Sequence, residues 1–146
     1  MKLFAKIIIL VVVFLAGLLV GISVMQKPAV APTISDKLAA GITVALILDY
    51  GNGEVQNYRD IEMQLGQTVF DLLKKVTAEN VIEFSYQDYG AGLGALIESI
   101  NNVKNDPVKN TFWHYFVNDV FAEVGASNYP LADGDVVAWK YAEAQY

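Results

Sequence analysis

The chain has 146 residues, enough for one domain with its own hydrophobic core. Residues 36–146 carry seven basic and sixteen acidic side chains, a formal charge of 7 − 16 = −9. A surface of that sign repels nucleic-acid phosphates and anionic lipid headgroups, so we expect no nucleic-acid partner. The absence of cysteine excludes a disulfide framework, a thiolate nucleophile and a cysteine-based zinc site.

The first expected element is a membrane-spanning helix. Residues 7–25 contain no charged side chain and are flanked by Lys2, Lys6 and Lys27. A helix of that length is roughly 28 Å long, which matches the hydrocarbon core of a bilayer. Positive charge before the span favours an N-terminus inside the cell. The sequence therefore predicts a single-pass signal-anchor in the cell membrane over residues 1–27, with the following domain outside the cytoplasm.

An alternative for this segment is a signal peptide that is removed, which would leave a secreted protein. The sequence A-V-A at residues 29–31 offers a small-x-small cleavage site. Pro32 would follow the cut, and proline there is a poor substrate for signal peptidase. Residues 28–37 contain two prolines among small residues and are expected to form an extended linker. The extracytoplasmic domain is expected over residues 38–146.

The domain is predicted to begin with a β-hairpin. Residues 42–48 are β-branched and aliphatic, Gly51-Asn52-Gly53 is a turn sequence, and residues 55–63 have extended character.

One amphipathic helix is predicted next. Thr68 is a suitable N-cap, and Asp71 lies where an acidic side chain interacts favourably with the helix start. A single apolar stripe at the spacing i, i+3, i+4 and i+7 is formed by Val69, Leu72, Leu73 and Val76. A helix with one apolar face requires one sheet to pack on.

The rest of the domain is predicted to consist of strands and loops. Strands are expected over residues 82–87, 95–100, 112–117, 120–123 and 136–141. Two strands, one helix and then further strands predict an α+β fold, a β-grasp-like mixed sheet with one helix packed across one face.

Two segments resemble a known bacterial family. They are TVFDLLKKV at residues 68–76 and FWHYFVNDVFAEVGASNYPLADGDVVAWKY at residues 112–141. They are similar to the DUF4430 family, also described as the transcobalamin-like C-terminal domain and grouped with β-grasp ligand-binding modules. The family has an aromatic strand ending in V-N-G, a Y-x-L step and D-G-D before the last strand. Asp119 stands where the family usually has the glycine of V-N-G.

The resemblance implies a ligand-binding module that is secreted or attached to the cell surface. In transcobalamin-type carriers, the related domain covers one face of a cobalamin that a separate helical domain mainly holds. No such helical domain is expected in this sequence. We therefore expect no cofactor, and cobalamin is kept only as a secondary candidate ligand.

Aromatic side chains on two predicted strands are the candidate binding residues. Trp113 and Tyr115 point to one face of their strand, and Trp139 and Tyr141 share one face of the last strand. In a matching register the four rings form one open face that stacks on a flat ligand or seats a partner. The alternative is a central strand whose rings fill the core. The candidate binding residues are Tyr86, Tyr89, Trp113, Tyr115, Trp139 and Tyr141.

Nothing in the sequence indicates an enzyme or a metal protein. His114 is the only histidine, and no motif supplies it with a nucleophile, a carboxylate partner or further metal ligands. Residues 133–135, D-G-D, are interpreted as a turn because the other ligands of a calcium loop are absent. Residues 90–94, G-A-G-L-G, are interpreted as a strand connector that forms a lip over a binding face. We predict no catalytic and no metal site.

The predicted function is a membrane-tethered extracytoplasmic binding module. It would contact a small ligand, or an envelope protein or glycan, through the aromatic sheet face and the loops at residues 88–94 and 101–110. The alternative is a structural or assembly protein of the cell envelope that pairs through a sheet edge and has no small-molecule ligand. A buried aromatic face would favour that alternative, and an open concave face would favour ligand binding.

Overall fold

The computed structural model describes residues 41–90 and 92–144. The chain divides into two units, residues 1–32 and 33–146, and the structure below is that of the described part of the second unit. The predicted membrane span at residues 7–25 and the linker at residues 28–37 lie outside the described residues. No helix within the described ranges has the length and apolar character needed to cross a membrane.

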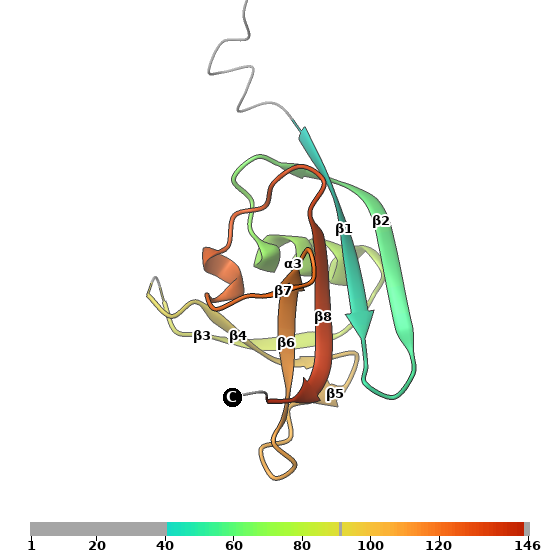
Figure 1. The fold of residues 1–146 in the computed structure, drawn as a ribbon, viewed down its shortest axis with the longest axis vertical. Coiled ribbons are helices and arrows are strands. Elements are labelled where there is room, and N and C mark those ends of the chain that lie inside the picture. Colours follow the sequence, from blue (N-terminus) through green and yellow to red (C-terminus); the bar gives the residue numbers. More distant parts are fainter. Residues whose placement is uncertain (1–40, 91, 145–146) are drawn as a thin grey trace, which may run out of the picture. The chain divides into compact units, whose positions relative to one another are not determined.

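The main sheet has five strands in the order β2-β1-β8-β6-β7 (Figure 1). β1 and β8 are parallel neighbours, and the other pairs are antiparallel, so the sheet is mixed. The first and last strands of the domain thus lie side by side within the sheet. The strands are β1 (Gly41–Asp49), β2 (Val55–Gln64), β6 (Thr111–Val117), β7 (Val120–Phe121) and β8 (Val136–Glu143).

β2 forms one edge of the main sheet, and a bulge interrupts it. The register between β1 and β2 shifts between Val44 and Leu46, so that Arg59 and Asp60 lie opposite Ala45. Asp60 has a φ of 54° there, in the left-handed region. A bulge of this kind bends an edge strand and breaks the row of groups with which another strand could pair.

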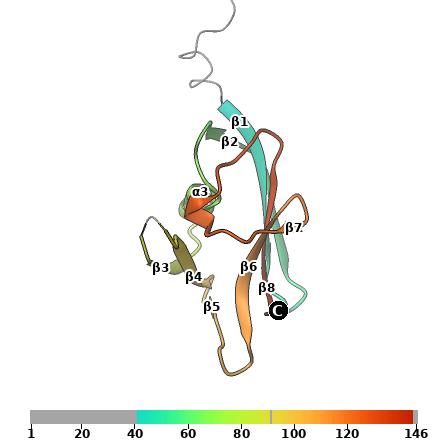
Figure 2. The same cartoon turned by 60° about the vertical axis from the view of Figure 1, so that its left-hand side comes forward.

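Three further strands form a separate antiparallel sheet in the order β3-β4-β5. In Figure 2 this small sheet and the helix α3 lie on the same side of the main sheet. We expected a single sheet, and this was wrong because β3 and β4 pair with each other and not with the main sheet. The described residues form a mixed α+β fold dominated by sheets, with one α-helix. The elements are β3 (Phe84–Asp88), β4 (Ala95–Ile100), β5 (Val103–Lys104) and α3 (Val69–Glu79).

The start of α3 is fixed by the residues that the sequence indicates. The Thr68 side chain accepts from the amide of Asp71 at 3.3 Å, and the Asp71 carboxylate accepts from the amide of Thr68 at 3.0 Å. This capping box satisfies two backbone donors that the helix leaves free. The predicted apolar stripe is buried, at Val69, Leu72, Leu73 and Val76.

The end of α3 has the geometry of a Schellman motif. Asn80 is the C-cap, and the amide of Ile82 donates to the carbonyl of Thr77 at 2.9 Å. Val81, between them, has a φ of 56° and an almost fully exposed side chain. A β-branched residue therefore occupies a left-handed position where glycine is usual.

The turns at the ends of β6 and β8 are joined by side-chain hydrogen bonds. Asn118 and Asp119 have φ values of 52° and 65°, as a two-residue hairpin turn requires. The Asn118 amide donates to Asp135 Oδ1 at 2.9 Å, and the second oxygen of Asp135 accepts from the amide of Ala132. Asp133 accepts from the amide of Thr43 at 2.8 Å. The prediction of a turn at residues 133–135 is confirmed.

The hydrophobic core lies between the main sheet and the layer made by α3 and the small sheet. It contains alternate residues of β1, the stripe of α3, and buried rings of β6 and β8. Among the described residues, the members of this cluster lie between Ile42 and Trp139, within the second unit.

Candidate functional site

Four of the candidate rings lie on one face of the main sheet, as predicted. β6 and β8 pair with Trp113 opposite Tyr141 and Tyr115 opposite Trp139. The ring centroids are 5.5 Å apart in the first pair and 5.1 Å apart in the second. The register that the prediction required is therefore confirmed.

The prediction that this face is open was wrong. Trp113, Tyr115 and Trp139 are only 3 to 6% exposed, because the face carries the core of the domain. Tyr50 packs edge-on against Trp113 with ring centroids 5.7 Å apart. Tyr141 is half-buried, and its hydroxyl donates to the carbonyl of Lys104 at 2.8 Å. The rings fill the core, which is the alternative that the strand pattern left open.

The loop at residues 101–110 holds Trp113 in place. The indole N–H of Trp113 donates to the carbonyl of Val103 at 2.8 Å, and its amide donates to Asn105 Oδ1 at 2.9 Å. Farther along the loop, Lys109 pairs with Asp106 at 3.2 Å. The loop therefore supports the core. That it also belongs to a contact surface stays a prediction.

A pocket of about 220 Å³ opens at the edge of β6, between β4 and β7. β7 pairs with the last two residues of β6, and beyond it the amide of Ala122 donates to the carbonyl of Tyr115 at 3.2 Å. Residues 113–115 of β6 are among those that line the pocket. We call this site the β6-edge pocket. It is lined by Tyr89, residues 93–97, residues 113–115, Phe121, Ala122, Gly125, Ala126 and Trp139.

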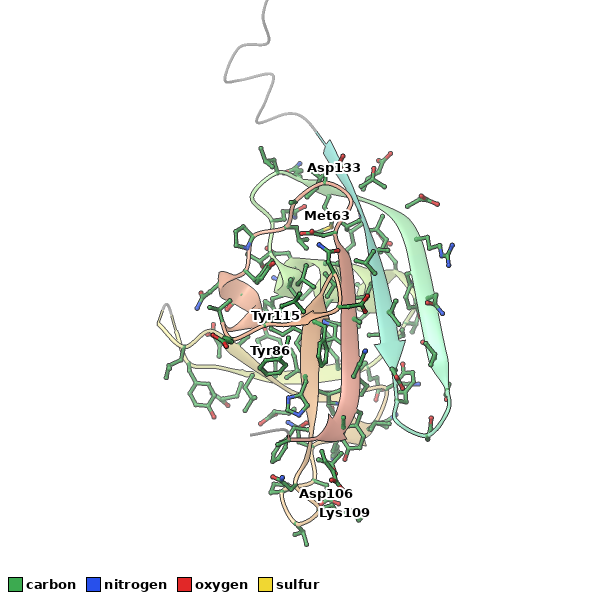
Figure 3. The ribbon with its side chains drawn as sticks, in the orientation of Figure 1. Met63, Tyr86, Asp106, Lys109, Tyr115 and Asp133 are labelled. Atoms are coloured by element: carbon green, nitrogen blue, oxygen red, sulfur yellow. The ribbon has the colours of Figure 1, made fainter. Side chains whose placement is uncertain are left out.

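The pocket brings together some of the six candidate residues and not others. Tyr89, Trp113, Tyr115 and Trp139 line it, and Tyr115 extends from the middle of β6 (Figure 3). Tyr86 extends from β3, where its ring packs against the rings of Phe70 and Phe84 at 4.7 and 5.6 Å. Tyr86 and Tyr141 are therefore structural neighbours of the core and do not line the pocket.

Exposed apolar side chains form the rim of the pocket. Leu93 is 75% exposed, and the side chains of Tyr89, Leu96 and Phe121 are about half exposed. Adjacent exposed apolar groups around a hollow are typical of a binding site. We did not predict Leu93, Leu96 or Phe121, because nothing in the sequence indicates that residues 93–97 and Phe121 meet.

Two loops meet at one end of the pocket with their backbones in contact. A Cβ atom added to Gly125 would lie 2.5 Å from the carbonyl oxygen of Leu93. One added to Gly94 would lie 2.7 Å from Ser127 Oγ, which accepts from the amide of Ala95 at 3.1 Å. Only residues without a side chain allow this approach. Leu93 and Gly94 thus lie beside the pocket, and the lip that we expect over residues 90–94 stays a prediction.

The polar groups of the pocket are few. No Asp, Glu, Lys or Arg is among its lining residues in the described part of the chain. The Tyr115 hydroxyl donates to the carbonyl of Val124 at 2.5 Å, and burial together with the nearby Tyr129 raises the pKa of Tyr115 to about 12. Trp139 Nε1 and His114 Nε2 are buried and have no hydrogen-bond partner among the described residues. Leaving such a group unpaired costs about 1–3 kcal/mol.

Residues 66–143 match the family model of DUF4430, a domain of unknown function. The chain belongs to the DUF4430 family. The matched range runs from just before α3 to the end of β8 and contains every residue that lines the β6-edge pocket. The resemblance seen in the sequence is confirmed. No curated protein matches the chain.

Two solved structures share the fold of this DUF4430 domain. One is the crystal structure of "a putative metal binding protein from Ruminococcus gnavus ATCC 29149", with a TM-score of 0.55 and 15% identity over 71% of this chain and 99% of that one. The other is haptocorrin in complex with Cbi, with a TM-score of 0.61 and 18% identity. That match covers 70% of this chain but only 26% of the haptocorrin chain. At these identities the likeness shows the fold alone.

Potential metal ligands do not cluster in the described part of the DUF4430 chain. Residues 41–90 and 92–144 contain no group of three or more His, Cys, Asp or Glu side chains that could hold a metal ion. The ring of His114 lies near the rings of Phe112 and Phe121, with centroids 6.4 and 5.9 Å apart. The carboxylates of Asp133 and Asp135 are bound to amide groups of the turns.

Proposed function

We propose that the protein is a ligand-binding module of the cell envelope and that the β6-edge pocket receives part of a small molecule. The observation that carries the proposal is a pocket at the edge of β6 that is lined by aromatic residues and has an exposed apolar rim. The fold relative haptocorrin, crystallised with Cbi, supports it. The parallel pairing of β1 with β8 beside antiparallel hairpins supports a β-grasp-like main sheet.

The size of the pocket limits what it can hold. Sites for whole small molecules usually measure ~300–1,000 Å³. A pocket of about 220 Å³ therefore suits one ring or one side arm. A larger ligand would project past Leu93 and Phe121 toward a second surface. Cobalamin stays a secondary candidate on this ground, since only one of its side arms would fit.

We further propose that residues 7–25 tether the module to the outer side of the membrane as an uncleaved signal-anchor. The uncharged run flanked by lysines supports this. In cells that produce the chain, the protein should remain in the membrane pellet after alkaline carbonate extraction, with Met1 at its N-terminus. A soluble product beginning near residue 32 would instead show cleavage and secretion.

A fragment screen by two-dimensional NMR on residues 33–146 tests the pocket. Bound fragments should perturb residues 93–97 and Phe121. The L93S variant should weaken their binding, because it removes an apolar group from the rim. The control is V108S, which removes an even more exposed apolar side chain outside the pocket, 97% against 75% exposed. Equal binding by L93S, V108S and wild type, or perturbations confined to other residues, would refute the proposed site.

Calorimetric titration of the same unit with cobalamin, and with its analogue that lacks the lower ligand, tests the secondary ligand. Binding at micromolar concentration would make the residues lining the pocket the first positions for alanine substitution. If no heat of binding is measured, cobalamin is excluded as a ligand. The pocket itself is then tested by the fragment screen alone.

The second candidate is a structural role through sheet-edge pairing, and the buried aromatic face favours it. One observation speaks against it. The bulge at Arg59 and Asp60 interrupts the β2 edge at which another strand would add. We propose no catalytic role, since the neighbours of the His114 ring are phenylalanine rings.

A further inference from the structure

We propose that the face of the main sheet opposite the core carries a second site, which binds a small zwitterion such as an apolar α-amino acid. Its carboxylate would pair with Arg59 and its ammonium group with Asp60. The site lies beyond the proposed function, because it shares no lining residue with the β6-edge pocket.

The site is a hollow of about 350 Å³ over β1, beside the bulge of β2. We call it the bulge pocket. Its volume lies within the range of ~300–1,000 Å³ that is usual for sites of whole small molecules. The lining residues are Thr43, Val44, Ala45, Ile47, residues 57–60 and residues 134–136.

The strands give the bulge pocket an apolar floor on the outer face of the sheet. Leu46 is fully buried in the core, so Ala45 and Ile47 on either side of it point to the opposite face. Val136 pairs with Ala45 and precedes the buried Val137, so it points the same way. The short side chain of Ala45 leaves room above this floor for an apolar group of a ligand.

The bulge places two opposite charges beside this floor. Tyr58 packs against the core, so Arg59, the next residue, points to the outer face. Asp60 has a φ of 54° in the bulge and lines the same pocket. Both side chains are exposed, and neither forms an ion pair with another described residue, whereas Lys74 and Lys109 do. Two unpaired charges over one hollow match a ligand that carries both signs.

The remaining charges favour a ligand without net charge. Residues 36–146 have a formal charge of −9, which repels an anion, and a simple cation would meet the guanidinium of Arg59. Asp135 also lines the pocket, but its carboxylate already accepts from the amide groups of Asn118 and Ala132. Asp60 is therefore the carboxylate that remains for an ammonium group. The guanidinium of Arg59 suits a carboxylate, with which it can form two parallel hydrogen bonds.

Three probes separate the two charges of the ligand. L-Leucine carries both charges, N-acetyl-L-leucine carries only the carboxylate, and L-leucinamide carries only the ammonium group. The full chain in detergent micelles, with ¹³C-labelled methyl groups, reports binding through the NMR signals of Ala45, Ile47 and Val136. Leucine should shift these signals. Each analogue should bind about three- to tenfold more weakly, the loss expected for one hydrogen-bonded charge at an exposed site.

Variants of the two charged residues test which group each one holds. R59Q should weaken the binding of leucine and N-acetyl-leucine by about three- to tenfold and should not weaken that of leucinamide. D60N should weaken the binding of leucine and leucinamide but not that of N-acetyl-leucine. It keeps the backbone of the bulge, because asparagine and aspartate both tolerate a positive φ.

Two further variants serve as controls. K104Q removes an exposed positive charge outside the bulge pocket and should leave all three affinities unchanged. A45L keeps both charges and fills the floor, so it should weaken the binding of all three probes.

The outcomes separate this inference from the proposed function. If R59Q weakens leucine and leucinamide equally, Arg59 does not hold the carboxylate, and the zwitterion site is overturned. If leucine leaves the signals of Ala45, Ile47 and Val136 in place, the site is also overturned. Neither result bears on the β6-edge pocket, whose methyl groups at Ala95 and Ile97 give separate signals.

Discussion

Gly125 is the residue at which the two loops beside the pocket come closest. The G125A variant should lower the free energy of unfolding by about 1–3 kcal/mol, the usual cost of overpacking. The added methyl group would lie 2.5 Å from the carbonyl oxygen of Leu93 and 3.2 Å from the Cα of Gly94. These are backbone atoms, which cannot rotate away. Urea denaturation of residues 33–146 measures the change.

Gly92 supplies the matched control, because it lies in the β3–β4 connector that Gly125 contacts and a Cβ atom there would meet nothing within 4 Å. G92A should change the free energy of unfolding by less than ~0.5 kcal/mol, as expected for a surface substitution. If G125A were as mild as G92A, the two loops would separate readily and the closed end of the pocket would not be a fixed feature.

At the scale of residues, the sequence predicted which rings share a face but not whether that face is covered. Both faces of β6 carry aromatic side chains, so alternation alone could not decide between the face of Trp113 and that of Phe112. The small sheet and α3 decide it by packing on the former (Figure 2). The rim residues Leu93 and Phe121 could not be predicted, because they meet only after distant segments pack together.

At the scale of elements, the end of α3 offers room for stabilisation. V81G should raise the free energy of unfolding by about 1 kcal/mol, because it relieves a β-branched residue in the left-handed region. Val81 has a φ of 56° and is 92% exposed, so little packing is lost. Urea denaturation checks the gain. V81A keeps the Cβ atom and should gain much less, and an equal effect of both variants would show that backbone strain is not the cause.

The strands and the helix were largely predictable from the sequence because their signals are local. Turn residues mark the ends of β1 and β2. The N-cap at Thr68 and the apolar stripe mark α3. The division into two sheets was not predictable, because strand pairing depends on contacts between distant segments. β5 was also missed, since a strand of two residues carries no periodic pattern.

At the scale of the whole molecule, buried tyrosines make stability sensitive to alkaline pH. Burial raises the pKa of Tyr50, Tyr58 and Tyr115 above the ordinary value of 10.0, and that of Tyr115 reaches about 12. Above pH 10 the unfolded chain loses these protons first, so the folded state binds more protons. The free energy of unfolding should therefore fall as the pH rises from about 10 toward 12. Urea denaturation at a series of pH values measures it.

The Y115F variant isolates the largest contribution to that pH dependence. It removes the titrating hydroxyl along with its hydrogen bond to Val124, so the variant should be less stable at neutral pH but lose stability less steeply above pH 10. A slope identical to that of the wild type would mean that other groups govern the alkaline transition.

The parallel pairing of β1 with β8 also determines when the domain can form during synthesis. Ala45 pairs with Val136 and Asp49 with Lys140, so nearly the entire domain must leave the ribosome before this pair can close. Contacts between such distant segments form slowly and leave earlier segments exposed in the meantime. A premature stop codon before β8 would leave the finished β1–β2 hairpin without its parallel neighbour. The apolar side chains of β1 would then be exposed to water. Folding of this chain therefore waits for its last strand, whatever the order in which the other elements appear.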